Sequence, residues 1–348
     1  MKNRCHASAA IFLSACLLSA ASAASAAADP VEDFYKGRSI TLTIGTDAGG
    51  GYDQYARTLA RNMGRFIPGN PTIIPKNMPG ADGIQAANRI YSIAPRDGSE
   101  IGSFHRDIPI LPLLGAMKIP FDGHELSWIG SMNKETAVCM AWHTTGIKRF
   151  EDTFTKQLIV GNTAAGAALD SFEPPLMNLF GAKFKVISGY VGGQNVDLAM
   201  EKGEIEGRCG VSWSSLVARN ASWFQEKKVN FFVQLGLEKH PDLPDVPMIQ
   251  DYAKTQADRD ALNLLLIPGL IGRPFLAPPR IPAERLAALR SAFNATLKDE
   301  AFLADAKKQR MEVQLVTGEE VAKVIDSAYA SPPAVIQRAK EAMAGAVY

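Results

Sequence analysis

The chain contains 348 residues, which is long enough for two domains with separate cores. Hydrophobic residues make up 47% and charged residues 21%, a composition typical of a folded globular protein. Its 37 lysine and arginine residues nearly balance 36 aspartate and glutamate residues, so the net charge is only +1. This balance excludes the clustered basic excess that is expected of a nucleic-acid-binding protein.

Residues 1–28 predict a secretory signal peptide. Two basic residues near the start precede a short apolar run at 9–18, and the alanine- and serine-rich residues 20–26 offer several A-x-A cleavage sites. We therefore expect export to the periplasm as a soluble protein, because no later apolar run approaches the roughly 20 residues of a transmembrane helix. Lipid anchoring at Cys16 is an alternative, but the apolar residues after Cys16 favour ordinary cleavage.

Short β-rich runs alternate with helical stretches along the remainder of the chain. The first series is expected to have strands at 39–45, 71–75 and 99–104 and helices at 53–63 and 83–93. The second is expected to have strands at 138–142, 157–161, 184–188 and 229–235 and helices at 171–179, 282–298 and from 318. Strands that alternate with helices pair in parallel through right-handed crossovers, so the sequence predicts an α/β fold. Ligands of such sheets bind beyond the carboxyl ends of the strands.

Two glycine-bearing loops each join an expected strand to an expected helix. In residues 46–53, three glycines permit a tight turn and expose backbone N–H groups, and the N-terminus of the next helix adds a partial positive charge. This favours an anionic ligand, although neither the nucleotide P-loop nor the dinucleotide fingerprint is present. Residues 161–167 form the counterpart in the second series, so the two loops could face each other across a cleft.

Three polar residues lie at the end of the third expected strand. Ser103 is among its last residues, and His105 and Arg106 follow it, so all three are candidates for a ligand cleft. The alternative for His105 is a polar loop residue whose hydrogen bonds are satisfied within the protein.

Further candidates lie in the second series. Arg208 could clamp a carboxylate through its bidentate guanidinium, or it could form a salt bridge with a neighbour such as Glu206. Tyr190 and Trp213 could form an aromatic wall, although core packing is the default for both.

The sequence carries no recognised catalytic or metal-binding pattern. It contains neither a G-x-S-x-G elbow nor an H-E-x-x-H motif, and no Cys/His cluster has metal-ligand spacing, so we expect no catalysis, no cofactor and no metal. Cys139 and Cys209 remain after the signal peptide, and an oxidising compartment would permit them to pair. Because two cysteines 70 positions apart define no disulfide framework, two separately buried thiols are favoured.

Short motifs follow one another along nearly the whole chain. They occupy residues 48–53, 56–57, 77–83, 94–98, 161–166, 203–206, 243–247 and 275–282. On these motifs the chain resembles the solute receptors of tripartite tricarboxylate transporters, the TctC-like family. The resemblance implies a two-lobed periplasmic-binding-protein fold, type II-like, in which each lobe is a mostly parallel sheet flanked by helices and the ligand lies between the lobes. Lobe 1 is expected at 29–142 plus 266–348, and lobe 2 at 143–265.

The resemblance also implies a function. It indicates a monomeric receptor outside the cytoplasm that captures a small carboxylate and delivers it to the permease subunits of a tripartite transporter, without catalysis. In relatives, backbone N–H groups and waters from the two loops hold the carboxyl group. Carried over to this chain, the implied residues are Ala48, Gly49, Gly50, Gly51 and Asp53 in the first loop and Asn162, Thr163, Ala164, Ala165, Gly166 and Ala167 in the second.

Some positions depart from the family pattern. Tyr52 stands where relatives commonly have threonine and Ala48 where they have proline, while Asp47 adds a negative charge beside the expected anion site. In the second loop, Asp170 and its apolar neighbours replace hydroxyl residues and a histidine, which leaves fewer donors for a second polar end of the ligand. We therefore expect a small organic acid that is aromatic, mostly apolar or amino-bearing, with Tyr52 and Arg208 as compensating contacts.

Two other functions stay open on the sequence. The closed receptor could touch a sensor domain instead of a permease, a difference that lies only in the partner surface. An exported enzyme on the same scaffold could use His105 or Asp170 as an acid or base, but the absence of a nucleophile–base pattern counts against it.

Overall fold

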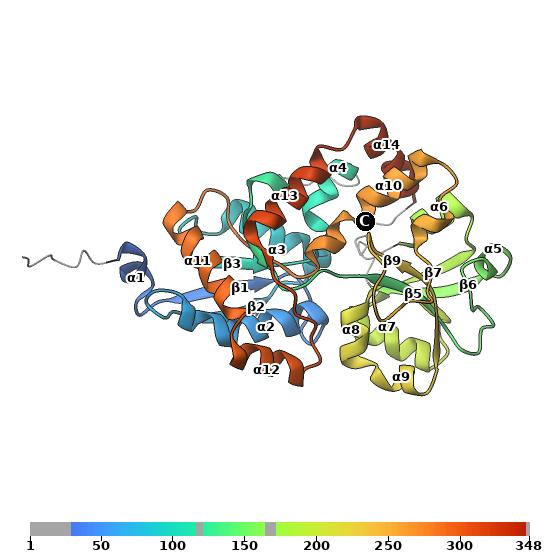
Figure 1. Cartoon of the computed structure of the whole chain (residues 1–348), viewed down its shortest axis with the longest axis horizontal. Coiled ribbons are helices and arrows are strands. Elements are labelled where there is room, and N and C mark those ends of the chain that lie inside the picture. The colour runs from blue at the N-terminus through green and yellow to red at the C-terminus, as the bar shows by residue number, and fades with distance from the viewer. Residues whose placement is uncertain (1–28, 116–120, 164–171, 346–348) are drawn as a thin grey trace, which may run out of the picture.

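The computed structural model describes residues 29–115, 121–163 and 172–345. In Figure 1 these residues form two lobes that lie side by side, each built around one β-sheet. The expected signal peptide and part of the second glycine-bearing loop lie outside the described residues.

The first sheet has six strands in the order β11-β4-β10-β3-β1-β2. Their bounds are β1 (Ser39–Ile44), β2 (Thr72–Asn77), β3 (Glu100–Ser103), β4 (Ser127–Ser131), β10 (Pro274–Ala277) and β11 (Val316–Thr317). β1 pairs in parallel with β2 and β3, whereas β10 and β11 run antiparallel to their neighbours. Both faces of β1 are covered, because Leu42 and Thr43, which point to opposite faces, are both buried.

The second sheet has five strands in the order β7-β6-β8-β5-β9. Their bounds are β5 (Ala137–Trp142), β6 (Leu158–Thr163), β7 (Phe184–Tyr190), β8 (Gly207–Ser212) and β9 (Val229–Leu235). β6 is parallel to β7 and β8, and β5 is antiparallel to β8 and β9. Both sheets are therefore mixed, so the expectation of a mostly parallel sheet in each lobe was wrong. β8 was not expected from the sequence, although every one of its residues is buried.

Helices surround both sheets. In the first part of the chain they are α1 (Pro30–Tyr35), α2 (Gly51–Met63), α3 (Ile84–Asn88), extended by a π-helical turn at Arg89–Ile93, and α4 (Leu111–Leu114). The middle of the chain forms α5 (Asp152–Thr155), α6 (Glu173–Phe180), α7 (Gly192–Glu201), α8 (Trp213–Arg219), α9 (Ala221–Gln225) and α10 (Gln256–Leu266). The last helices are α11 (Ala283–Thr296), α12 (Glu300–Lys308), α13 (Gly318–Tyr329) and α14 (Pro333–Ala342). Within the described ranges, none of the helices has the length and apolar character needed to cross a membrane.

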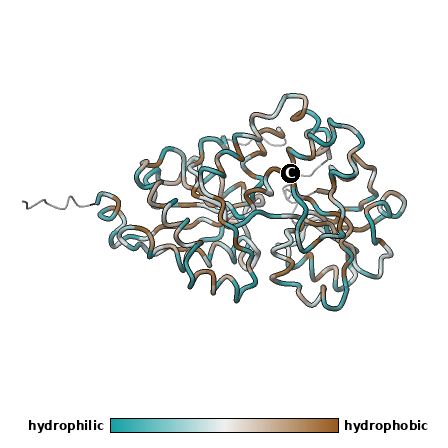
Figure 2. Tube along the Cα trace, in the orientation of Figure 1, coloured by the Kyte–Doolittle hydropathy of each residue, from teal (hydrophilic) through white to brown (hydrophobic). Residues whose placement is uncertain are grey.

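Helix α2 shows why these sequences fold as they do. Tyr55, Leu59 and Met63 recur every four residues and are all buried, so one face of the helix lies on the first sheet. Figure 2 shows hydrophobic residues along the central strands of both lobes. One apolar cluster continues from one lobe to the other and includes Leu276 of β10 and Phe232 of β9.

The chain passes between the two sheets more than once. It enters the second sheet between β4 and β5 and returns just ahead of β10, and α14 then packs against α6 and α10. Asn178 Nδ2 in α6, for example, donates to Ala342 O in α14 at 2.8 Å. Because β5 pairs only within the second sheet, we propose that the lobe boundary lies ahead of Ala137 instead of at 142, and that α14 belongs with the second lobe.

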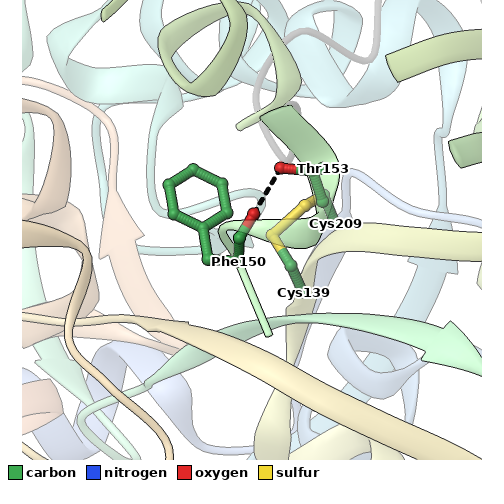
Figure 3. Close-up of a disulfide and its surroundings, with 4 residues drawn as sticks. All are labelled: Cys139, Phe150, Thr153 and Cys209. Carbon is green, nitrogen blue, oxygen red and sulfur yellow. Dashed lines mark hydrogen bonds between the residues drawn. A yellow bond between two sulfur atoms is a disulfide. The ribbon is translucent and has the colours of Figure 1, made fainter. Parts of the chain in front are cut away.

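The two cysteines form a disulfide, so the expectation of two separate thiols was wrong. Cys139 of β5 and Cys209 of β8 lie on neighbouring antiparallel strands, where a register shift brings their Cα atoms to 4.0 Å. Figure 3 shows the bond beside Phe150 and Thr153, in the interior of the second lobe. The two cysteines are 70 residues apart in the sequence, and they become neighbours only because β5 and β8 pair.

Candidate functional site

The carboxyl ends of strands from both sheets meet at the junction of the lobes. β1 and β3 end there from the first lobe, and β8 ends there from the second. Among the hydrogen bonds that cross the junction, Gln194 Nε2 donates to Gly49 O at 2.6 Å, and Arg106 Nη1 donates to Ser212 Oγ at 3.1 Å. We call this region the interlobe site, and it comprises residues 45–53, 103–107, 192–194 and 212–215.

Asp53 organises the glycine-rich loop. Its carboxylate accepts the Gly49 N–H at 2.8 Å, Arg57 Nε at 2.8 Å and Asn77 Nδ2 at 2.8 Å. Burial alone would raise the pKa of Asp53, but the hydrogen bonds from Arg57, Gly49 and Asn77 lower it below its ordinary value. Asp53 therefore stays ionised and fixes the loop, whose Gly49 adopts a φ of 84° that favours glycine. Its carboxylate faces the loop's own donors, so this side chain shapes the loop.

The N-terminus of α2 opens at the interlobe site. Gly50 is its N-cap residue and no side chain caps the helix, so the N–H groups of the first turn have no partner within the helix. The helix dipole adds a partial positive charge at the same place. Both features favour an anion at this end of α2, where Gly50, Gly51 and Tyr52 were predicted to contact the ligand.

Tyr52 links α2 to the end of β3. Its hydroxyl oxygen accepts the backbone N–H of Arg106 at 3.1 Å, and its ring centroid lies 4.6 Å from that of His105. The guanidinium of Arg273 lies 4.5 Å from the centroid of the same tyrosine ring. Ser103 is buried, and its carbonyl oxygen accepts the Gly45 N–H at 2.8 Å, which fixes the start of the loop. Tyr52, Ser103, His105 and Arg106 are thus brought together.

The remaining loop candidates divide between the two lobes. Ala48 is exposed, and Asp47 Oδ2 lies 3.8 Å from the position that a β-carbon on Gly192 would take, so Asp47 faces the start of α7. Asn162 is buried at the end of β6, where its side-chain oxygen accepts the Thr163 N–H at 3.0 Å. The other candidates of the second loop lie outside the described residues: Ala164, Ala165, Gly166, Ala167 and Asp170.

The candidates of the second lobe have partners within that lobe. Arg208 Nη1 donates to Asp197 Oδ1 at 2.8 Å and to Gly193 O at 3.2 Å, so its salt bridge is with α7 and not with Glu206.

The two aromatic candidates pack in the same lobe. The ring of Trp213 packs against Phe224 and Phe231, and Tyr190 lies against the same apolar cluster. In this conformation the side chains of Arg208 and Trp213 are buried in the second lobe.

Sequence reasoning missed a buried polar cluster directly behind the site. Arg273 pairs with Glu135 at 3.1 Å, and it donates to the hydroxyls of Ser214 and Ser215 at 3.0 Å each. These residues come from three distant segments, and no spacing in the sequence relates them. The one available signal was the position of Arg273 just before the 275–282 motif.

A separate groove of about 730 Å³ lies along α11. Arg290, Asn294 and Lys298 are among its lining residues. We do not assign the ligand to this groove, because it lies on one lobe alone and Arg290 already pairs with Glu319 at 2.7 Å.

Comparisons with known proteins bear on the fold. No family model matches the chain, and no curated protein matches it. Among solved structures, the periplasmic binding protein BugD is similar at a TM-score of 0.68 and 19% identity, over 88% of this chain and 98% of BugD. MatC from Rhodopseudomonas palustris with bound malate is similar at 0.65 and 18%, over 88% and 99% of the two chains. A TctC solute-binding protein from Polaromonas is similar at 0.60 and 20%, over 85% and 96%. These likenesses confirm the predicted fold: the chain has the two-lobed α/β architecture of periplasmic solute-binding proteins.

Proposed function

We propose that this protein is a periplasmic receptor of the TctC-like family, which binds a small carboxylate between its lobes and delivers it to the permease of a tripartite transporter. The observation that carries the proposal is the uncapped N-terminus of α2 at the junction of the lobes. An anionic group there would receive backbone hydrogen bonds and the favourable end of the helix dipole. The similar solved structures support a binding function, since they are named as binding proteins and not as enzymes.

The surroundings of this helix end suggest the chemistry of the ligand. Tyr52, His105 and Arg106 supply an aromatic surface and a buried guanidinium beside the anion position. Asp47, at the opposite edge of the loop, could hold an amino group. We therefore propose an organic acid with an aromatic or apolar body, or an amino acid. The malate in MatC is a small carboxylate, in agreement with the anionic part of this proposal.

Binding would close the lobes by a hinge motion. The segments between β4 and β5 and ahead of β10 connect the sheets, so they are the natural hinge. A ligand that contacts both lobes stabilises the closed arrangement over the open one. The closed receptor would then present one composite surface to its permease.

A thermal-shift screen with carboxylates and amino acids, followed by calorimetry, tests the proposal. We expect one chemical class to raise the melting temperature. At a hundredfold excess over the dissociation constant, the free energy of unfolding should rise by about 2.7 kcal/mol. The compound should be recovered unchanged, which separates a receptor from an enzyme. Absence of a shift with every class would contradict the proposal.

Gly50→Val supplies the site-specific test. The φ of Gly50 is −75°, and an added β-carbon would find its nearest neighbour at an ordinary 3.6 Å, so the fold should tolerate the side chain. The branched side chain would nevertheless cover the end of α2, so we expect loss of binding at nearly unchanged stability. Ala283→Val, on the exposed side of α11, is the matched control and should bind normally.

A further inference from the structure

Each of the two segments that connect the sheets carries one charged residue in the protein interior. Glu135 lies between β4 and β5, and Arg273 lies just ahead of β10. Their side chains are 0% and 1% exposed, and the closest ionic contact is 3.1 Å. The ion pair therefore joins the two connecting segments to each other at the proposed hinge.

On one side, this pair holds the first turn of α8 in the second lobe. Arg273 Nη2 donates to the hydroxyl oxygens of Ser214 and Ser215 at 3.0 Å each. Glu135 Oε1 accepts the backbone N–H of Ser214 at 3.2 Å, and the hydroxyl of Ser214 donates to Glu135 Oε2. The orientation of α8 is thus set by hydrogen bonds to the hinge.

On the other side, Arg273 contacts the first turns of α2 in the first lobe. Its guanidinium lies 4.5 Å from the ring centroid of Tyr52 and 5.0 Å from that of Tyr55, within the range of cation–π attraction. Gly51, the first residue of α2, approaches so closely that a β-carbon there would lie 2.4 Å from Ser215 Oγ. The starts of α2 and α8 are therefore in direct contact.

A buried ion pair is a poor source of net stability, because burial removes the hydration of both charges. What it supplies is direction, since each hydrogen bond of a guanidinium fixes an angle as well as a distance. Apolar side chains in the same volume would lack this directional constraint, which the hydrogen bonds of Arg273 supply.

We propose that Arg273 is a positioning residue of the interlobe site: anchored by Glu135, it holds the start of α2 against the start of α8 so that the lobes meet in one geometry. This inference rests on the proposed receptor function, in which both helix starts border the ligand. It assigns Arg273 no direct contact with the ligand.

The test measures the distance between the lobes without any added ligand, so it does not depend on whether a carboxylate binds. Spin labels at Lys308→Cys in α12 and Gln225→Cys in α9 report this distance, and both positions are exposed. The double variant Glu135→Gln/Arg273→Met removes the buried charges while it keeps the volume. We expect its melting temperature to stay close to that of the parent protein and its distance distribution to broaden and shift to longer values.

A second pair of variants tests the contact without replacing Arg273, whose hydrogen bond to the Ser214 hydroxyl both variants leave in place. Gly51→Ala forces Ser215 Oγ away from its present position, so we expect the same broadening. Adding Ser215→Ala should restore the parent distribution, because the new β-carbon would then lie 3.5 Å from that of residue 215.

The matched control is Arg290→Met/Glu319→Gln, which removes an ion pair from the surface of the first lobe. It should leave the distance distribution unchanged. A parent distribution retained in both Glu135→Gln/Arg273→Met and Gly51→Ala would overturn the proposal, whatever the outcome of the ligand screen. A ligand screen that fails, combined with the expected broadening, would instead reject the receptor function and retain the positioning role.

Discussion

The carboxylate of Asp53 accepts the backbone N–H of Gly49, four residues earlier in the chain, at 2.8 Å. Not every backbone N–H group of the first loop is therefore available to a ligand. The Gly49 N–H is used within the loop, and the donors that remain for an anion are those at the start of α2. The glycine-rich sequence indicated the correct location, but it did not show this division between groups that shape the loop and groups that can bind.

Asp53→Asn should lower the free energy of unfolding by about 2 kcal/mol near neutral pH, because the carboxylate loses charge-assisted bonds from Arg57 and Gly49. The pKa of Asp53 is lowered in the folded state from 3.8, so its stabilisation is present above about pH 4 and is lost as the pH falls through the folded value. Urea unfolding from pH 7 to pH 3 should show the deficit shrinking at the acid end. Asp33→Asn, at an exposed position, is the control; a pH-independent deficit would contradict the assignment.

β1 and β9, which carry long apolar and β-branched runs, could be predicted from the sequence, whereas β8, with its mixed composition, could not. β1 and β9 were predicted almost to the residue, because buried strands require such runs. β8 was missed because it contains two glycines and Arg208, which resemble a loop. It is nevertheless the central strand of its sheet, and Arg208 pairs with Asp197 of α7.

Contacts between distant segments set the limit of prediction at the site. The loop ends of β1 and β3 were located because local glycine and polar patterns mark them. The disulfide and the Arg273–Glu135 pair depend on which strands become neighbours, and no local pattern encodes that. For the same reason Arg208 was correctly identified as a residue able to form a salt bridge, whereas its partner was not.

Tyr52→Phe should lower the free energy of unfolding by about 1–3 kcal/mol, because the backbone N–H of Arg106 would lose its acceptor in a buried position. The ring contacts with His105 and Arg273 would remain, so the change isolates the hydroxyl. Chemical denaturation measures the effect. Tyr91→Phe removes a hydroxyl whose hydrogen bond to Glu125 is exposed and should have little effect. An equal loss in the free energy of unfolding for the two variants would show that the hydrogen bond of the Tyr52 hydroxyl contributes no more to stability than an exposed one.

Removal of the disulfide by Cys139→Ala/Cys209→Ala should lower the free energy of unfolding by about 4 kcal/mol. The bond closes a loop over a sequence separation of 70 residues, and the chain-entropy model gives this magnitude for such a loop. Denaturation with and without a thiol reductant is the measurement. The reductant should destabilise the parent protein and leave the alanine variant unaffected. A parent protein that behaves identically in both conditions, with two titratable free thiols after unfolding, would mean that the bond does not form.

Glu312 should make stability fall as the pH rises. Burial, Glu135 and Asp242 raise its pKa from 4.5 to about 7, so the folded protein holds a proton that the unfolded chain releases between these values. The favourable contribution is therefore complete below about pH 4.5 and is lost as the pH rises through 7. Relative to the parent protein, the free energy of unfolding of Glu312→Gln should be higher at pH 8 than at pH 5. The difference should be under about 1 kcal/mol, because the side chain is half-exposed beside His240. Melting temperatures across this pH range are the measurement, and Glu284→Gln at an exposed position is the control. If the melting temperature of Glu312→Gln changes with pH in the same way as that of the parent and the control, the assignment is refuted.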